Sequence, residues 1–290
     1  MNEILKSIIL TPFNFLYKIN PELELKILFN LKTGRKLDLV EPKGFNEKVN
    51  WLKLYDKDER RPLLSDKYTV RDYVEKITGD KILNKLYWHG ENPEDIPFDE
   101  LPNQFVIKVT HGSTFNIICN DKEKLNRDEA VKQLKIWLKA KFIPCYGEWW
   151  YGLVKPQVIV EKYLENPEKN ELLDYKVFCF NGEPKLIDVH TGRFGVHRRN
   201  VYDTKWDFLE DVSFKYPQSD AIEKPVVLQE LLEYARMLSK GFAHVRIDFF
   251  IVNNQIYFSE FTFANGAGFD KITPYSFDLL MGEWLELPEL

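Results

Sequence analysis

The stretch that decides the fold is HVRIDFFIVNNQIYFSEFTFANGAGFD, residues 244–270. It predicts two β-strands joined by a short turn at Asn253 and Asn254. Asp248 interrupts the apolar first strand, and Glu260 stands near the end of the second. A carboxylate in an apolar strand is costly to bury unless a cation accompanies it. Two carboxylates on neighbouring strands suit Mg²⁺, which prefers oxygen ligands and shares them with nucleotide phosphates.

The register of this hairpin decides whether the two carboxylates lie on the same face. With a two-residue type I′ turn at Asn253 and Asn254, Asp248 would pair with Ser259, and Glu260 would face the other way. A three-residue loop or a bulge would instead place Asp248 opposite Glu260. A metal site therefore requires one of these irregularities. The alternative is a half-buried hairpin with one solvent-facing acid.

Other polar residues of the stretch join the candidate site. Arg246 is a fixed cation two residues before Asp248, and Thr262 stands two residues after Glu260. The segment Asn-Gly-Ala-Gly, residues 265–268, follows directly. These residues supply a positive charge, a hydroxyl and backbone groups beside the predicted metal ligands.

Length and composition are those of a globular protein of one large domain or two lobes. The chain has 290 residues, of which 44% are hydrophobic and 29% charged, and its net charge of −5 argues against nonspecific nucleic-acid binding. The odd number of cysteines, three, fits no zinc or disulfide pattern and predicts a reducing cytosol. We expect neither a signal peptide nor a transmembrane segment. The amphipathic first helix leaves peripheral contact with a membrane surface open.

A strand, a loop of small residues and a second strand indicate a phosphate-covering segment. Residues 104–109 form a short apolar strand that carries Lys108, and Thr-His-Gly-Ser-Thr, residues 110–114, follows it. Backbone N–H groups, hydroxyls and a lysine could supply donors to phosphates. Lys67 stands in the first turn of a predicted helix, where the helix dipole disfavours a cation. The alternatives are a strand lysine that reaches solvent, an ordinary turn at His111 and a surface lysine at Lys67.

Three further segments carry candidate chemistry. The buried strand at 158–160 leads into Glu161-Lys162-Tyr163-Leu164, which could offer backbone groups to a purine edge. A hairpin is predicted to turn at Asn181-Gly182. A basic segment follows it and could bind phosphate or carboxylate, or could be a solvated loop; it contains Arg193, His197, Arg198 and Arg199. The triplet Asp56-Lys57-Asp58 lies in a charged run that favours a solvated face.

Taken together, the segments resemble the ATP-grasp superfamily and its teichuronopeptide-biosynthesis (TupA-like) branch. The similarity extends over about residues 44–285 and includes SDKYTVRDYV, FVIKVTHGS, DYKVFCFNGEPKLI, HRRNVYD, RIDFF and EFTFANGAGFDKITP. It implies an α+β fold of two lobes with ATP between them, residues 65–164 and 165–290. A helical N-terminal region, residues 1–64, would precede them.

The resemblance also implies roles for individual residues. Lys67 and Lys108 would hold the ATP phosphates, and Arg246 would lie near the γ-phosphate. The phosphate-covering loop would consist of His111, Gly112 and Ser113, and the adenine-facing linker of Glu161, Lys162, Tyr163 and Leu164. Asp174 would be the acid that binds the ribose. The Mg²⁺ ligands would be Asp248, Glu260 and Thr262. Thr262 stands where the superfamily often has Asn, and Thr114 stands where the branch usually has Gly.

The implied activity is that of an ATP- and Mg²⁺-dependent carboxylate–amine ligase, with Lys108 and Arg246 as catalytic residues. A substrate carboxylate would take the γ-phosphoryl group, and an amine would then displace phosphate to form an amide. The acceptor would be a glycan, uronic acid or amino acid held by Arg193, His197 and Arg198. The expected setting is bacterial cell-surface polysaccharide or teichuronopeptide-like polymer biosynthesis, in the cytoplasm or at the inner face of the membrane. A kinase that stops at a phosphorylated product, a glycosyltransferase and a non-catalytic binding module remain as alternatives.

Overall fold

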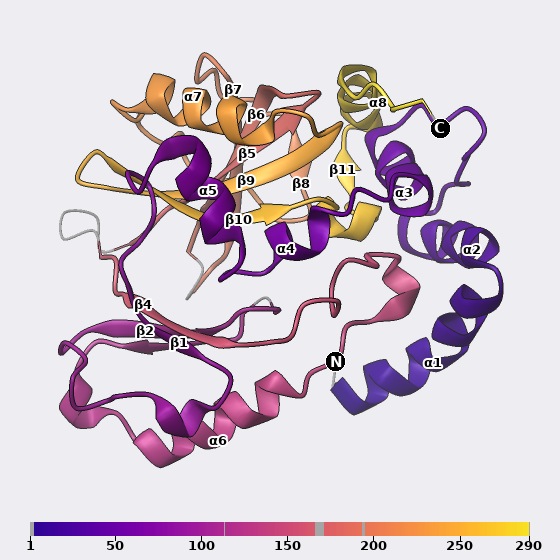
Figure 1. The fold of residues 1–290 in the computed structure, drawn as a ribbon. Helices are drawn as coiled ribbons and strands as arrows, with labels where there is room; N and C mark the ends of the chain where they lie inside the picture. The colour runs from indigo at the N-terminus through magenta and orange to yellow at the C-terminus, as the bar shows by residue number, and fades with distance from the viewer. Residues whose placement is uncertain (1–2, 113, 166–170, 193–194, 290) are drawn as a thin grey trace.

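Two antiparallel sheets face each other across the molecule in the computed structural model, which describes residues 3–112, 114–165, 171–192 and 195–289 (Figure 1). The first sheet has the strand order β1-β4-β2-β3. Helix α6, Arg127–Leu138, and a short 3₁₀ helix, η1, Pro93–Asp95, pack beside it. The strands are β1, Leu86–Gly90; β2, Phe105–Val109; β3, Asn116–Cys119; and β4, Val158–Lys162.

The second sheet is larger and has the order β10-β9-β5-β6-β7. Helix α7, Leu228–Ser239, packs on β5, β6 and β9, and a two-stranded sheet of β8, Ser213–Phe214, and β11, Ile272–Thr273, adjoins β7. The main strands are β5, Asp174–Phe180; β6, Glu183–Thr191; β7, Arg198–Asp203; β9, His244–Val252; and β10, Gln255–Thr262. The predicted hairpin turn at Asn181 and Gly182 is confirmed, since both residues have the positive φ that such turns need.

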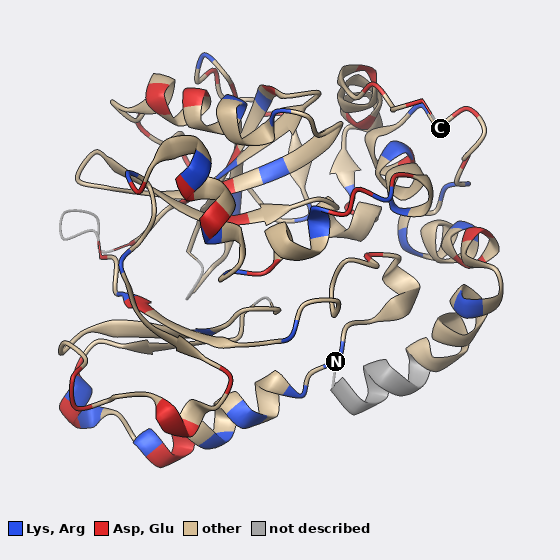
Figure 2. Cartoon of the chain, in the orientation of Figure 1, with Lys and Arg blue, Asp and Glu red and all other residues tan. Residues whose placement is uncertain are grey.

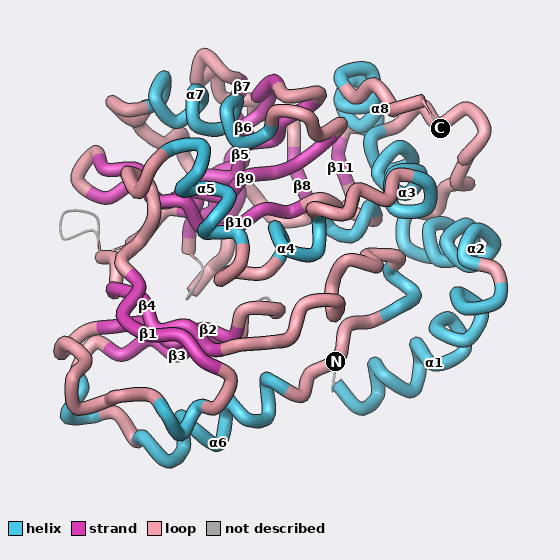
Figure 3. The backbone as a smooth tube through the Cα atoms, in the orientation of Figure 1, coloured by secondary structure: helices cyan, strands magenta, loops and turns pink. Residues whose placement is uncertain are grey.

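Helices α1, α2 and α3 of the N-terminal region lie along one side of the molecule, whereas α4 and α5 lie against the second sheet and its helix α7 (Figure 3). α1 contacts α2 and the 3₁₀ helix η3, Pro144–Tyr146, while α3 packs against α8 and the 3₁₀ helix η4, Asn265–Gly268. The other α-helices are α1, Glu3–Ile19; α2, Pro21–Thr33; α3, Phe45–Tyr55; α4, Arg61–Ser65; α5, Val70–Thr78; and α8, Tyr275–Trp284. The remaining 3₁₀ helix is η2, Lys122–Lys124. Among the described residues, no helix is both long and apolar enough to cross a membrane.

Local sequence explains how two of these helices are placed. Asn20 caps α2 by accepting a 3.0 Å hydrogen bond from the backbone N–H of Leu23, and Gly34 ends the helix in the left-handed conformation. α8 approaches the start of α3 closely because Gly282 has no side chain. A Cβ at that position would lie 1.9 Å from the carbonyl oxygen of Lys43.

The apolar core is divided between the two sheets. The first sheet has a core of its own that includes Phe105, Ile107 and Val160, whereas α4 and α5 contribute to the core of the second sheet. The Tyr73 hydroxyl of α5 donates a 3.1 Å hydrogen bond to the carbonyl of Leu238 in α7. Helices α4 and α5 therefore pack with the second sheet, although they precede the first sheet in the chain.

Charged residues gather on helix α6 of the first lobe (Figure 2). Lys, Arg, Asp and Glu follow α6 along its length (Figure 2), and its ion pairs are largely exposed, as between Lys132 and Glu129. Exposed ion pairs of this kind contribute little to stability. The second sheet, by contrast, carries buried charged residues, among them Asp174, Lys176 and Asp248.

Candidate active site

The β9–β10 hairpin has the register that a site between Asp248 and Glu260 requires. Asn253 and Asn254 form the two-residue turn, both with positive φ, and Gln255 pairs with Val252. The register shifts between Phe258 and Glu260, so that Glu260 pairs with Asp248. One extra residue, Ser259, forms a β-bulge there. The predicted irregularity is thus a bulge, and it places the two carboxylates opposite each other.

A row of buried charged side chains lies on the face of the second sheet that carries Asp248. Arg246 forms a two-pronged ion pair with Asp248, with N–O distances of 2.7 and 2.8 Å. Lys176 of β5 contacts the same carboxylate and also lies 2.7 Å from Asp174. Arg246 donates further hydrogen bonds to Thr262, at 3.0 Å, and to Asn265. The network fixes the guanidinium of Arg246 in one position.

The pKa values of these groups follow from their burial and pairing. Burial alone would raise the pKa of Asp248, but Arg246 and Lys176 hold it well below the usual range. Burial would lower the pKa of Arg246, but the carboxylates of Asp248 and Glu260 raise it. Both groups therefore remain charged inside the protein at neutral pH.

Lys176 was not among the predicted site residues. It lies in DYKVFCF, a strand in which every residue is buried, so its ammonium must find carboxylates within the protein. Asp174 stands two residues before it on the same face, and Asp248 is its cross-strand partner. The lysine in an otherwise apolar strand was the signal that could have identified it.

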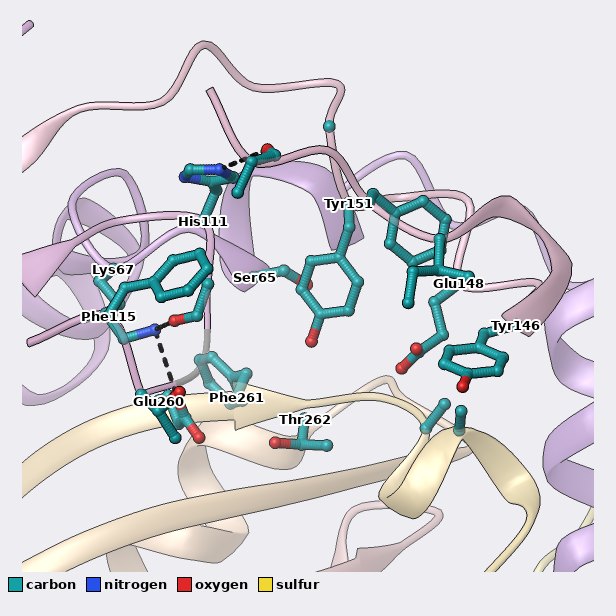
Figure 4. A pocket seen from close by; sticks show the side chains of 18 of the residues that line it. Ser65, Lys67, His111, Phe115, Tyr146, Glu148, Tyr151, Glu260, Phe261 and Thr262 are labelled. Carbon is teal, nitrogen blue, oxygen red and sulfur yellow. Dashed lines mark hydrogen bonds and ion pairs between the residues drawn. The ribbon is translucent and has the colours of Figure 1, made fainter. Parts of the chain in front are cut away.

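A cavity of about 660 Å³ opens above this charged face, between the two lobes (Figure 4). Lys67, Arg246 and Glu260 line it together with the loop at Gly112 and the hydroxyl-bearing Thr262. The Lys67 ammonium donates a 2.8 Å hydrogen bond to the carbonyl of Gly112 and lies 3.4 Å from Glu260. Residues from both lobes thus meet at one point in the cavity.

The predicted phosphate-covering loop borders this cavity. His111 donates from Nε2 to the carbonyl of Ala140 at 3.0 Å, which requires the proton on that nitrogen. Gly112 must be small, because a Cβ there would lie 2.2 Å from the ring of Phe115. Thr114 has a φ of +66°, in the left-handed region that favours glycine and that costs other residues about 1–2 kcal/mol. Ser113 lies outside the described residues.

Lys108 lies in a second group of charges, on the first sheet. Its ammonium is 2.7 Å from Glu161, whose other oxygen lies 3.0 Å from Arg71. Glu161 therefore holds two cations, one from each of its carboxylate oxygens. The backbone N–H of Lys162 donates a 2.9 Å hydrogen bond to the carbonyl of Lys85, and the carbonyl of Lys162 accepts a 2.9 Å hydrogen bond from the side-chain amide of Asn84.

The remaining predicted positions lie around the second sheet and the linker. Asp174 is buried and paired with Lys176, while Tyr163 and Leu164 follow the end of β4. His197 contacts His190 at 3.1 Å, and Arg198 donates a 2.8 Å hydrogen bond to the carbonyl of Gln218. Neither His197 nor Arg198 is among the described residues that line the cavity. Arg193 lies outside the described residues.

The donor set fits a Mg²⁺ ion shared with a nucleotide. Among the described residues, no three His, Cys, Asp or Glu side chains are grouped to hold a metal by themselves. Mg²⁺ at a nucleotide site needs only one or two carboxylates, since phosphates and water supply the other ligands. Glu260 faces the cavity with Asp248 opposite it, although Asp248 would be shared with Arg246 and Lys176. These two acids, with Thr262 beside them, would hold the ion.

The comparison with known families decides what this arrangement represents. The family model described as TupA-like ATP-grasp matches residues 47–286, most of the chain. The chain belongs to the TupA-like ATP-grasp family. The predicted family and the predicted α+β ATP-grasp fold are therefore confirmed. A search of the curated proteins found no match.

Solved structures similar to this TupA-like protein share little sequence with it. D-alanine–D-alanine ligase from Bacillus anthracis, complexed with ATP, is 17% identical, with a TM-score of 0.43 over 77% of this chain and 64% of that one. N5-carboxyaminoimidazole synthetase from Staphylococcus aureus, complexed with ADP, is 14% identical, with a TM-score of 0.43 over 76% and 52%. L-amino acid ligase from Bacillus licheniformis is 14% identical, with a TM-score of 0.47 over 77% and 49%. The chain spans less than two thirds of the length of each.

Proposed function

We propose that this TupA-like protein is an ATP- and Mg²⁺-dependent carboxylate–amine ligase that forms an amide through an acyl phosphate. The observation that carries the proposal is the meeting of Lys67, Arg246 and Glu260 in one cavity between the two lobes. Two cations and an acid suit the transfer of a phosphoryl group, which requires positioning and charge neutralisation more than covalent chemistry. The family match supports the same activity.

Each residue has a defined part in this proposal. Lys67 and Arg246 would neutralise charge on the transferring phosphoryl group, and the backbone of the loop at Gly112 would cover it. Mg²⁺, when bound, offsets charge on the phosphate oxygens of ATP. Lys108 would contact the phosphates nearer the base, and the linker from Glu161 to Leu164 would face adenine. Asp174 stays the predicted ribose acid.

The biological setting is proposed from the family resemblance. The acceptor would be a glycan, uronic acid or amino acid with a free carboxylate, and the donor an amine. The product would belong to a bacterial cell-surface polysaccharide or a teichuronopeptide-like polymer. We place the reaction in the cytoplasm, at the inner face of the membrane if the N-terminal helix binds lipid.

Nucleotide binding is the first testable consequence. We expect ATP with Mg²⁺ to stabilise the protein by about 2.7 kcal/mol at a hundredfold excess over Kd, because the ligand binds only the folded state. Differential scanning fluorimetry with ATP, GTP and UDP-glucose would measure it. Stabilisation by UDP-glucose alone would favour a glycosyltransferase. ADP release across a panel of amino and uronic acids, with and without amines, then separates ligase from kinase, since a kinase needs no amine.

The basic segment yields a second prediction, for the carboxylate acceptor. Arg198→Ala should raise the KM for the acceptor, with a loss of about 1.5–3 kcal/mol for one charged hydrogen bond, while the KM for ATP changes much less. Arg198→Lys should retain only part of the affinity for the acceptor that Arg198→Ala loses, because lysine keeps the charge but lacks the planar fork. Steady-state kinetics with each substrate varied in turn is the measurement. An equal rise in both KM values would assign this segment to the nucleotide instead.

A further inference from the structure

The cavity continues beyond the residues assigned to phosphate and metal. Its other end is formed by the segment 142–152, which contributes Tyr146, Glu148 and Tyr151. In Figure 4, the Glu148 carboxylate lies between the side chains of Tyr146 and Tyr151, across the cavity from Lys67. A site built only for ATP phosphates would have no use for a further acid, since that acid would repel them.

The Glu148 carboxylate has no direct partner within the described residues. It forms no hydrogen bond or salt bridge there, although Lys53 and Lys141 are both near this part of the cavity. Lys53 is committed elsewhere, because its ammonium donates to the carbonyls of Tyr146, at 2.8 Å, and Ala267, at 2.6 Å. Lys141 is exposed. Glu148 is thus an acid that lines a cavity without a counter-charge in contact.

The surroundings of Glu148 indicate what would complete the site. Burial raises the pKa of Glu148, and Lys53 lowers it only in part, so a bound cation would relieve an unfavourable environment. Burial also raises the pKa of Tyr151, which keeps its hydroxyl protonated. The ring of Tyr146 already has the Lys32 ammonium 5.0 Å from its centroid. The aromatic ring of Tyr151, which also lines the cavity, is of the kind that attracts cations. A small organic cation with N–H donors therefore matches Glu148 and Tyr151.

We propose that this end of the cavity is the amine-donor site, where Glu148 binds the substrate as a primary ammonium group. The inference rests on the proposed ligase function, which requires an amine beside the phosphoryl-transfer end. It assigns the two ends of one cavity to two substrates. Lys67, Arg246 and Glu260 serve phosphoryl transfer from the nucleotide, while Glu148 and Tyr151 select the amine. The ligand class is a primary amine, such as the α-amino group of an amino acid or peptide.

Binding of simple amines tests this inference on the full chain. The probes are glycinamide and L-lysinamide, which carry ammonium groups but no carboxylate, and their N-acetylated and Nα,Nε-diacetylated counterparts as uncharged controls. Isothermal titration calorimetry, with and without ADP and Mg²⁺, measures Kd. We expect the ammonium probes to bind and the acetylated ones not to. Glu148→Gln should raise Kd about 10- to 150-fold, the value of one charge-assisted hydrogen bond.

Two controls make the outcome decisive. Glu129→Gln removes an equivalent charge from the exposed face of α6 and should leave Kd unchanged. The melting temperature of Glu148→Gln should change little, because the carboxylate makes no hydrogen bond or ion pair among the described residues and only a longer-range attraction to Lys53 is lost. The inference would be overturned if the acetylated probes bound as well as the ammonium probes, or if no ammonium probe bound. An unchanged Kd in Glu148→Gln would also overturn it. Nucleotide binding without amine binding would overturn the inference while sparing the proposed function. Amine binding without nucleotide binding would overturn the proposed function, and with it the role of this site as an amine-donor site, while leaving Glu148 as an amine-binding residue.

Discussion

Glu260→Gln is expected to lower kcat for ADP release by at least about 10²-fold, the scale of losing one electrostatic partner of a transition state. The change is isosteric and removes the acid that faces the phosphoryl-transfer end of the cavity. The fold should survive, because Glu260 is partly exposed and its ion pair with Lys67 is loose, at 3.4 Å. Such a pair contributes at most about 1 kcal/mol, or a few degrees in melting temperature. ADP release at saturating Mg²⁺ is the measurement.

A matched substitution separates this effect from a general loss of charge. Glu233→Gln alters an exposed acid of α7 and should leave both kcat and melting temperature unchanged. Unchanged kcat in Glu260→Gln would exclude Glu260 as an essential ligand. A large fall in melting temperature without metal would instead assign it a structural role. Titration of Mg²⁺ adds a third readout, since a lost ligand raises the concentration needed for half-maximal activity.

The register at Glu260 shows how far the sequence alone could lead. The two apolar runs of residues 244–270 predicted the strands of the hairpin, and Asn253-Asn254 predicted its turn. Pairing of Asp248 with Glu260 was conditional on a longer loop or a bulge, and the structure resolves the choice at Ser259. A bulge has no strong residue signature, because one unpaired residue differs from its neighbours only in backbone geometry. The turn could therefore be predicted from its residues. The bulge could be predicted only as one of the two irregularities that a metal site between Asp248 and Glu260 would require.

Other parts of the site lay beyond pattern reasoning. Glu148 sits in an aromatic-rich segment without strand or helix periodicity, so no local pattern places its side chain in the cavity. The partners of Lys108 and Glu161 could not be assigned either, because strands β2 and β4 are distant in sequence and meet only in the sheet. Likewise, α5 packs on the second sheet although it precedes the first, which its sequence pattern does not reveal.

Lys176→Met is expected to lower the free energy of unfolding by about 3–5 kcal/mol, the cost of breaking a buried ion pair by removing one partner. Lys176 is 3% exposed and bridges the carboxylates of Asp174 and Asp248, which are themselves buried. Methionine fills a similar volume, so the loss would come from charge and not from a cavity. Asp248 keeps its two bonds from Arg246, whereas Asp174 loses its 2.7 Å ion pair. Urea unfolding of both proteins would measure the difference.

A double substitution identifies the cause of that loss. Lys176→Met with Asp174→Asn should be more stable than Lys176→Met alone, because the neutral amide removes a buried charge that has lost its 2.7 Å ion pair. The free energy of unfolding of Lys185→Met, a substitution at an exposed position of β6, should stay within about 0.5 kcal/mol of that of the unsubstituted protein. Equal destabilisation in the single and double variants would mean that packing, not charge, makes Lys176 important.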